Sequence, residues 1–588
     1  MTAGIAFIRQ SESRAFHLIN TVNTVSFIHK MKSDPITFAH WRTPVLCIAA
    51  VSALYTALVL GFSSRVGRLA HEATYDDCLI LFDGLWRLDL MDREGFWAAL
   101  GSFLNVFPHS PWNTVQCFLA FQIFGVRDIS PYWLHIFPLA LFLSAVYLAL
   151  RGFPTWLRCL GVLAAVSFQL SYIIVYELRA DPAYAVLITA GLVWAILGTV
   201  HRDKISPTIV AAAYGALALS FYIKPTFFLN SLFIAIVFGA TLILYNLVKT
   251  QTGQSTEDKE EDASWLSRLW VSAKPLVPAA ITFAVIAAPL FILHFDYFYD
   301  YLIRNAFGSE TNIWKIEGGP LEAFRFFTVG WGGMQMMGGT LYSAVVLLLV
   351  GTILLAVYRS RTDVVAVGWM ALMTFAGLFV MLVGQLNTPF FGLTFHFLFV
   401  TTAFLTFARG ILRLSPRAGF AIAVVGFVAV ALWNVSVFRS YVDYPKVVEG
   451  TRVFSIGHKS AGIAGDILHR IDEEVREHPG QFGDANIFVA FNSAVSEGTL
   501  NWMAAKHGMG HRFHGFDRNQ QMEDYQSVLP TYKYVLTAEE GVPEMAMFLP
   551  TVSLHGLVHE MVAADPGFIP VAEFPTYTGK SIFLFRRK

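Results

Sequence analysis

The sequence predicts a polytopic α-helical membrane protein with about 11 transmembrane helices and a small C-terminal α/β domain outside the membrane. Two observations on composition support the membrane class. Hydrophobic residues make up 55% of the 588 residues and charged residues only 14%, against roughly 25% in soluble domains. The mean hydropathy of +0.53 is too high for a chain of this size to cover its apolar surface with polar groups. The third observation is that long apolar runs stop before residue 445.

The predicted crossings are apolar runs long enough for a hydrocarbon core of ~30 Å. They cover residues 43–62, 131–150, 157–177, 182–199, 207–222, 226–247, 275–295, 340–358, 364–384, 390–410 and 418–437. When the crossings alternate, the basic loops all fall on one side, which the positive-inside rule assigns to the cytoplasm. These loops contain Lys30, Lys32, Arg42, Arg151, Arg158, Arg202, Lys204, Lys249, Lys274, Arg359, Arg361, Arg409, Arg413 and Arg417. The N-terminus is therefore expected inside and the segment after residue 438 outside.

The same alternation decides how the apolar run 112–125 is interpreted. If it crossed the membrane, Arg151, Arg158 and every later basic loop would change sides, so we expect a juxtamembrane helix on the outer face. The transmembrane domain, 43–437, then contains an outer loop over 63–130 and a cytoplasmic linker over 248–274 with the TEDKEEDAS run. Residues 1–42 are expected to form a cytoplasmic amphipathic segment, because they lack the compact apolar core of a signal peptide.

Residues 445–588 are predicted to form the outer α/β domain. Short β-rich stretches, at 486–491, 532–537 and 581–585, follow a helical pattern over 464–478. His511 and His514 have metal-ligand spacing but no companion ligands, so they are interpreted as turn or surface residues. The four cysteines have no CxxC spacing, which argues against a disulfide framework or a thiolate metal site.

Ionisable residues gather in the outer loops. Glu72, Asp76 and Asp77 follow the first crossing, and apolar residues at helical spacing after them place Asp76 and Asp77 in the first turn of an amphipathic helix. A pair of acids in a loop is often only solvated.

Further charged residues mark the later outer junctions. His109 lies in a Pro-flanked entry to the juxtamembrane helix. Glu177, Arg179 and Asp181 lie at one junction, Lys224 at another, and Arg304 in an aromatic-rich outer loop. Each of these charges taken alone commonly snorkels to the interface. Together on one face they indicate a functional site, because ionisable groups near a membrane usually have a function.

These segments resemble the GT-C glycosyltransferases, in particular the group of protein O-mannosyltransferases and lipid A aminoarabinose transferases. The resemblance covers roughly residues 40–310 and is carried by YDDCLILFDGLWRLD (75–89), HSPWNTVQCFLAFQIFG (109–125) and YELRADPAYAVL (176–187). The sequence departs from the family pattern at Asp77, where Glu is frequent, and at His109-Ser110-Pro111, which replaces His-Pro-Pro.

The resemblance implies a sugar donor on a polyprenyl phosphate and an acceptor that is a glycan, a lipid or a protein. It also implies transfer at the periplasmic face of a bacterial inner membrane. A lipid phosphate leaves as a stable anion and needs fixed cations rather than an acid, for which Arg304, Lys224, Arg179 and His109 are candidates, with Glu72 as a further substrate-binding residue. Asp76 is the expected base of an inverting single displacement, and Asp77 and Asp181 would orient it. No cofactor is required by this scheme, although the three carboxylates could also hold Mg²⁺ or Ca²⁺.

The alternative class is a secondary transporter or a lipid flippase. Transporters place charges and broken helices at mid-membrane depth, often in repeated halves. The predicted crossings contain few charges and no visible repeat. His396 is the candidate exception, and a hydrogen-bonded structural role is the preferred interpretation. The balance of 42 basic and 42 acidic residues gives no electrostatic argument for a nucleic-acid partner.

Overall fold

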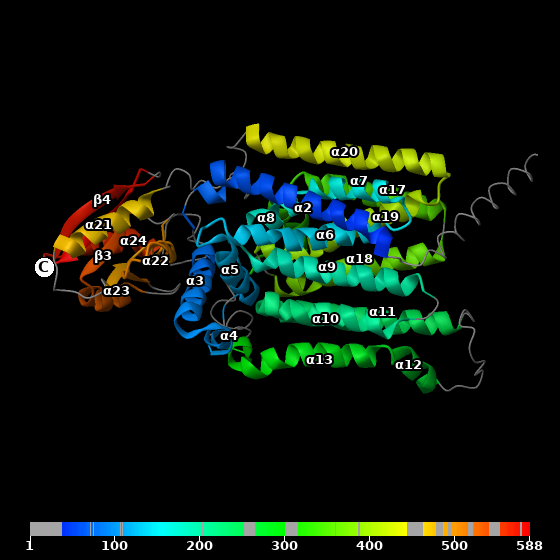
Figure 1. Cartoon of the computed structure of the whole chain (residues 1–588), viewed down its shortest axis with the longest axis horizontal. Coiled ribbons are helices and arrows are strands. Elements are labelled where there is room, and N and C mark those ends of the chain that lie inside the picture. The colour runs from blue at the N-terminus through cyan, green and yellow to red at the C-terminus, as the bar shows by residue number, and fades with distance from the viewer. Residues whose placement is uncertain are drawn as a thin grey trace, which may run out of the picture.

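The chain is a bundle of long apolar helices with an α/β domain at one end (Figure 1). The computed structural model describes residues 38–70, 72–73, 76–105, 108, 110–202, 205–251, 265–299, 315–358, 360–385, 388–443, 462–477, 486–491, 495–515, 521–539, 553–576 and 579–588. The fold class predicted from the sequence is confirmed.

Every predicted crossing overlaps a helix of the bundle. Within the described ranges, nine helical segments are long and apolar enough to cross a membrane, and a bent helix pair raises the number to ten. The nine are Arg42–Arg65, Pro131–Ala149, Ala180–Val200, Pro225–Lys249, Leu276–Leu293, Thr340–Val357, Arg361–Gly384, Pro389–Ile411 and Pro416–Arg439. The predicted crossing 157–177 is the bent pair, α7 (Thr155–Val166) and α8 (Gln169–Tyr176), whose axes differ by 67°. The predicted crossing 207–222 is α10 (Pro207–Ile223), which is shorter than a standard span.

The remaining bundle helices are bounded as follows. They are α2 (Phe38–Val66), α6 (Ile136–Ala149), α9 (Ala180–Val200), α11 (Phe228–Gln251), α12 (Trp265–Ala273), α13 (Leu276–Leu293), α15 (Pro320–Thr328), α16 (Trp331–Met336), α17 (Thr340–Val357), α18 (Arg361–Gly384), α19 (Leu393–Ile411) and α20 (Pro416–Asp443).

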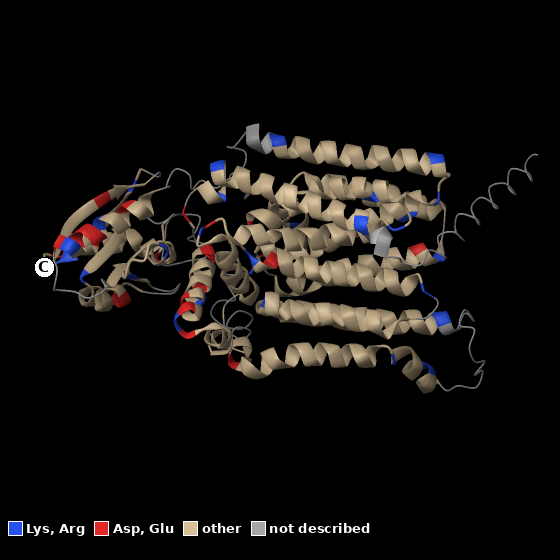
Figure 2. Ribbon diagram, in the orientation of Figure 1, with Lys and Arg blue, Asp and Glu red and all other residues tan. Residues whose placement is uncertain are grey.

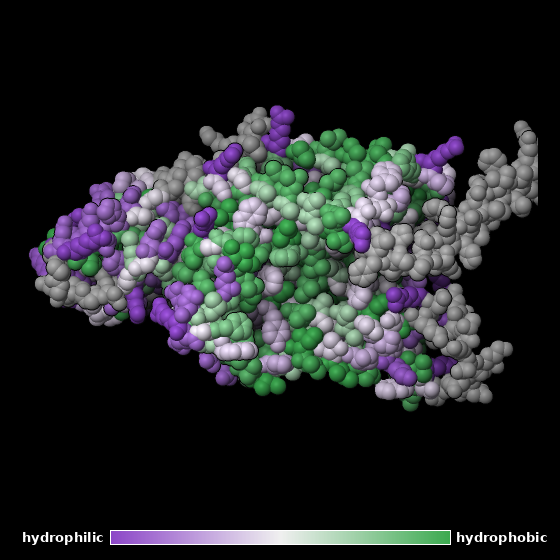
Figure 3. Space-filling view, in the orientation of Figure 1, coloured by the Kyte–Doolittle hydropathy of each residue, from purple (hydrophilic) through white to green (hydrophobic). Residues whose placement is uncertain are grey.

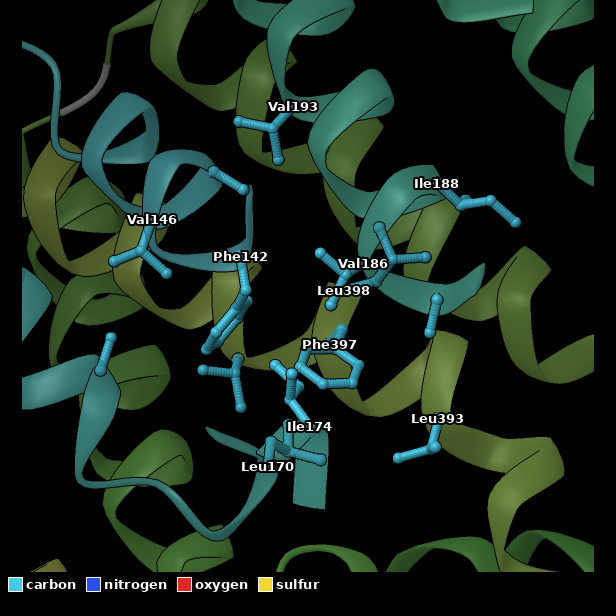
Figure 4. Packing of buried hydrophobic residues seen from close by; sticks show 14 of the residues in the cluster. Phe142, Val146, Leu170, Ile174, Val186, Ile188, Val193, Leu393, Phe397 and Leu398 are labelled. Atoms are coloured by element: carbon cyan, nitrogen blue, oxygen red, sulfur yellow. The ribbon is translucent and has the colours of Figure 1, made fainter. Parts of the chain in front are cut away.

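Helices α6, α8, α9 and α19 form the centre of the bundle (Figure 4). Phe142 of α6 and Phe397 of α19 meet edge to face, with ring centroids 4.9 Å apart. The buried share of the span is 78% for α9 but only 17% for α13, so α13 lies at the periphery. The bundle surface in Figure 3 is largely hydrophobic, and hydrophilic residues cover the α/β domain. A lipid-facing belt explains such an apolar surface. His396 lies in α19, where its Nε2 is 2.7 Å from the carbonyl oxygen of Phe327, as a structural histidine would be.

Three shorter helices lie between the bundle and the α/β domain (Figure 1). They are α3 (Asp76–Glu94), α4 (Phe96–Asn105) and α5 (Pro111–Phe124). Helix α5 covers the run 112–125, which was predicted to be helical. Helices α3 and α5 approach closely at Gly84, where an added Cβ would lie 2.4 Å from the Cβ of Cys117. This close packing fixes α3 against α5.

The α/β domain has a five-stranded mixed sheet in the order β2-β1-β3-β5-β4. Strands β1 (Asn486–Val489), β3 (Tyr534–Ala538) and β5 (Ser581–Arg587) were predicted, whereas β2 (Arg512–Gly515) and β4 (Phe568–Pro575) were not. Strand β2 is four residues long with one buried side chain, and β4 contains Pro570, so neither shows the alternation typical of a strand. The sheet is flanked by α21 (Ile463–Glu477), α22 (Glu497–Lys506), α23 (Met522–Val528) and α24 (His555–Ala564). Helix α21 confirms the helical pattern over 464–478. The predicted amphipathic segment over 1–42 falls almost wholly outside the described residues.

Candidate active site

Asp76 and Asp77 open α3 with different surroundings. The Asp76 side chain is 47% exposed and that of Asp77 is 2% exposed. At 3.6 residues per turn, adjacent helical residues point about 100° apart, so one carboxylate can face solvent while the other faces the bundle. Both carboxylates are favoured at a helix N-terminus.

Asp77 is fixed by two donors from elsewhere in the chain. Its Oδ2 accepts hydrogen bonds from Nε of Arg68 at 2.6 Å and from the hydroxyl of Tyr132 at 2.8 Å. Nη1 of Arg68 also donates to Oε2 of Glu177 at 2.7 Å. Arg68 thus bridges two buried carboxylates, one at the start of α3 and the other between α8 and α9.

The pKa values of this group reflect burial and charge pairing. Burial raises the pKa of Asp77, an effect that the charge and the hydrogen bond of Arg68 oppose. Burial would lower the pKa of Arg68, but Asp77 and Glu177 raise it well above its usual value. Arg68 therefore stays charged, and Asp77 is anchored rather than presented to solvent.

Arg179 connects this group to Asp76. Its Nη2 lies 3.2 Å from Oδ2 of Asp76, and its Nε lies 4.0 Å from Oε2 of Glu177. The guanidinium stacks 4.4 Å above the ring of Phe390, which fixes its plane. The guanidinium carries more N–H donors than these contacts use, so it can hold a further anion.

Asp181 and Lys224 form a second pair, with Nζ 3.3 Å from Oδ2. Asp181 lies in the first turn of α9 and Lys224 directly after α10. Both side chains are largely buried, and Oδ1 of Asp181 has no hydrogen-bond partner among the described residues. Asp181 also contributes to the field that raises the pKa of Arg179, so the pair and the Arg179 group belong to one electrostatic cluster.

An apolar cavity of about 560 Å³ lies beside this cluster. Its walls come from α4, α5, α6, α9, α10 and α13, and include Trp112, Phe137, Leu187 and Leu293. Ala183 and Ile223 also line it, and they are two residues or fewer along the chain from Asp181 and Lys224 respectively. The cavity can accept an apolar chain whose polar end lies near the charged cluster.

The structure brings together five of the predicted site residues, namely Asp76, Asp77, Arg179, Asp181 and Lys224. Glu72 makes a different contact, since its Oε1 accepts a hydrogen bond from the backbone N–H of Gly462 in the α/β domain. His109 and Arg304 lie outside the described residues. No group of three His, Cys, Asp or Glu residues suited to a metal ion occurs within the ranges that the structure describes.

Arg68, Glu177 and Tyr132 complete the cluster but were not among the predicted site residues. A signal existed for Arg68, because it lies just after the first crossing, in the same outer loop as the predicted site residues Glu72, Asp76 and Asp77. Glu177 was recognised only as a junctional charge. Tyr132 had no signal, because an aromatic residue at the start of a span is common.

The α/β domain docks on α3 and α5 through α22. The indole N–H of Trp502 and Nζ of Lys506 each lie 2.7 Å from a carboxylate oxygen of Asp128. The Trp502 ring stacks on Phe121 of α5, with centroids 5.8 Å apart. Sγ of Cys78, in the first turn of α3, lies 3.6 Å from Oγ1 of Thr499. The domain therefore packs directly behind the helical turn that carries Asp76.

Comparison with known proteins finds similarity in structure alone. No family model matches the sequence, and no curated protein does. The structure is similar to ArnT from Cupriavidus metallidurans in the apo state, with 12% identity, a TM-score of 0.57, and coverage of 91% of this chain and 97% of ArnT. For ArnT bound to undecaprenyl phosphate the identity is 12%, the TM-score 0.55 and the coverage 93% and 98%. The chain therefore shares the fold of ArnT, a GT-C lipid A aminoarabinose transferase, along nearly the whole length of both proteins.

Proposed function

We propose that this chain is a GT-C glycosyltransferase that transfers a sugar from a polyprenyl-phosphate donor to an acceptor. The reaction takes place at the end of the bundle that faces the α/β domain, on the periplasmic side of a bacterial inner membrane. The observation that carries the proposal is the charged cluster of Asp76, Arg179, Asp181 and Lys224 beside an apolar cavity of about 560 Å³. That arrangement suits a ligand with one anionic group and a long apolar tail.

The donor tail occupies the cavity, and its phosphate lies near Lys224 and Arg179. Two residues of the cavity wall show how close the cavity is to the charges. Ala183 is two residues from Asp181 along the chain, and Ile223 is next to Lys224. Support comes from the structure of ArnT with undecaprenyl phosphate, a polyprenyl phosphate bound to a protein of the same fold.

Charge balance in the cluster points to a further cation. Four carboxylates, those of Asp76, Asp77, Glu177 and Asp181, face three cations, those of Arg68, Arg179 and Lys224. An arriving lipid phosphate adds negative charge and needs more positive charge than the cluster holds. Arg304 supplies this additional positive charge, and His109 is a second ligand of the phosphate. Glu72 binds substrate at the edge of the site.

The transfer is an inverting single displacement. The acceptor hydroxyl oxygen attacks the anomeric carbon, the bond from that carbon to the phosphate oxygen breaks, and the lipid phosphate leaves with the electron pair. Asp76 takes the hydroxyl proton as the new bond forms, since its carboxylate is half exposed whereas Asp77 is anchored by Arg68 and Tyr132. Arg179 and Lys224 stabilise the departing phosphate, so no general acid and no cofactor is required. If Mg²⁺ or Ca²⁺ took part instead, a chelator would abolish turnover.

The first experiment tests the donor site. Leu187→Trp fills the cavity wall on α9, and Leu349→Trp makes the same change at an exposed position of α17 as a matched control. Undecaprenyl phosphate binding to the purified protein in nanodiscs should fall about tenfold or more for Leu187→Trp, the effect of losing ~1.4 kcal/mol. It should stay within twofold of wild type for Leu349→Trp. Equal binding by both variants would remove the cavity from the donor site.

The second experiment separates a transferase from a transporter or flippase. Detergent micelles do not separate two compartments, so they cannot report lipid translocation. Sugar transfer by the purified protein can still be measured in them. Polyprenyl-phosphate sugars carrying a labelled sugar are incubated with the protein and an envelope extract as acceptor. Release of free polyprenyl phosphate with transfer of the label supports the proposal. If every polyprenyl-phosphate sugar tested stays intact while the protein moves lipid between the leaflets of reconstituted vesicles, the proposal is overturned.

A further inference from the structure

A second group of charged residues lies at the opposite end of the bundle from the α/β domain, where Lys and Arg gather in Figure 2. It consists of Asp363 in the first turn of α18, Arg409 in the last turn of α19, Arg413 just after it, Arg151 between α6 and α7, and His201 at the end of α9. Helix α9 packs against both α18 and α19, and α6 packs against α9 and α19, so the four helix ends meet. We call these five residues the basic cluster.

The charges of the basic cluster do not balance. Asp363 is its one carboxylate, and it is buried. Nη2 of Arg413 donates to its Oδ2, and Nε of Arg409 lies 3.8 Å from its Oδ1. A single negative charge therefore serves two guanidinium groups, with Arg151 as a third nearby.

Arg409 is the member that lacks acceptors. Its side chain is only 7% exposed, and neither its Nε nor its Nη2 has a hydrogen-bond acceptor within the described part of the chain. A guanidinium cannot lose its proton in a protein, so burial does not neutralise it. A buried cation without full pairing is costly, which makes an additional anion favourable at this place.

The excess of positive charge in the basic cluster also affects His201. Burial, together with the charges of Arg409 and Arg151, lowers the pKa of His201 to about 4, so the ring is neutral at physiological pH. Its Nε2 is buried and has no hydrogen-bond partner among the described residues. Arg158 lies close by but is already satisfied, because its Nε and Nη2 donate to the carbonyl oxygen of Tyr147 at 3.1 and 2.9 Å.

We propose that Arg409, Arg151 and His201 bind the phosphate of an anionic phospholipid from the membrane leaflet at this end of the bundle. Phospholipid phosphates lie at the depth where transmembrane helices end, and basic pockets between helix ends bind such headgroups. Arg151 is exposed and Arg413 is 36% exposed, so both can guide the headgroup toward the buried guanidinium. Nη2 of Arg409 is covered in this structure, and the long arginine side chains make the adjustment that binding requires. The proposal is independent of the sugar-transfer site at the other end.

The test measures lipid binding rather than activity. Full-length protein is delipidated in a neutral detergent and titrated with phosphatidylglycerol, with phosphatidylcholine as the zwitterionic comparison, and bound lipid is counted by native mass spectrometry. Arg151→Gln, which changes an exposed residue, should weaken phosphatidylglycerol binding about fivefold, the effect of one Lys or Arg near an anionic headgroup. Arg409→Gln should weaken it at least as much. The matched control is Arg361→Gln, which removes an exposed charge from the start of α18 and should change binding less than twofold.

The outcomes separate a lipid from a free anion and from general electrostatics. A preference for phosphatidylglycerol that Arg151→Gln loses and Arg361→Gln retains supports the site. An equal loss in Arg361→Gln would mean that the net charge of this end attracts the lipid, and the proposal would fail. It would also fail if millimolar inorganic phosphate displaced the lipid while both lipids bound alike, since the cluster would then be a site for free phosphate. The exposed position of Arg151 keeps the test valid should Arg409→Gln prove unstable.

Discussion

Nη2 of Arg179 lies 3.2 Å from Oδ2 of Asp76, joining the residue just before α9 to the first turn of α3. The contact connects a half-exposed acid to the buried group of Arg68, Asp77 and Glu177. Asp76 and Asp77 are adjacent in sequence but have different surroundings, so we expect substitutions of the two residues to have different effects.

The Asp76→Asn variant should lower turnover by roughly 10² or more, the usual contribution of a positioned general base. The amide keeps the size of the side chain but is not basic, so donor binding should be largely retained. Single-turnover rates and donor titration in nanodiscs measure the two effects. Near-full activity in Asp76→Asn with an inactive Asp77→Asn would exchange their roles, and activity in both would refute the mechanism.

Arg68→Gln should destabilise the protein by about 3–5 kcal/mol, because it leaves buried carboxylates without their shared cation. Thermal unfolding in detergent measures the change. Arg65→Gln is the matched control, since Arg65 is exposed on the last turn of α2, three residues before Arg68, and its substitution should have little effect. Equal unfolding temperatures for the two variants would show that Arg68 does not hold this cluster together.

The hydrogen bond between Trp502 and Asp128 should couple the α/β domain to the bundle. A double-mutant cycle of Trp502→Phe and Asp128→Ala should give an interaction energy of about 0.5–3 kcal/mol in unfolding free energy. Lys506→Ala with Asp128→Ala gives a second cycle, expected to be weaker because the Lys506 side chain is 22% exposed. Additive effects in both cycles would mean that the two contacts do not hold the domain in place.

Arg304→Ala should weaken both donor binding and turnover, and Arg304→Lys should also be damaging. A guanidinium binds two phosphate oxygens at once, whereas an ammonium cannot, and its contribution should grow as charge develops on the leaving phosphate. Donor titration and single-turnover rates in nanodiscs measure both variants beside wild type. Wild-type values in Arg304→Ala would move the role to Lys224 or Arg179.

The orientation can be tested with single cysteines in a background without the four native ones. Gln526→Cys, in α23, should react with an impermeant reagent from the periplasmic side, and Thr362→Cys, in the first turn of α18, from the cytoplasmic side. Both positions are exposed, so access to the reagent depends on the side of the membrane alone. Labelling of both from one side would break the predicted topology.

The sequence by itself determined the long helices of this protein and three strands of its sheet. The long bundle helices follow from apolar runs, which are local. Helices α3 and α5 follow from helical spacing, and the positions of the basic residues argue against a crossing at 112–125. The charged residues at the junctions between predicted crossings were also readable from the sequence, because ionisable groups beside apolar runs are conspicuous. Strands β2 and β4 were missed because their short or Pro-interrupted sequences have no clear period.

Only the tertiary structure decided which of these charges meet. Arg68 reaches Glu177 across 109 residues of sequence, and Tyr132 reaches Asp77 across 55. No local pattern records such pairings, since they depend on how helices pack. Asp76 and Asp77 are alike in sequence, and only the phase of α3 against the bundle exposes one and buries the other. Burial then makes these pairings necessary for stability, because a charge that is removed from water must be paired within the protein.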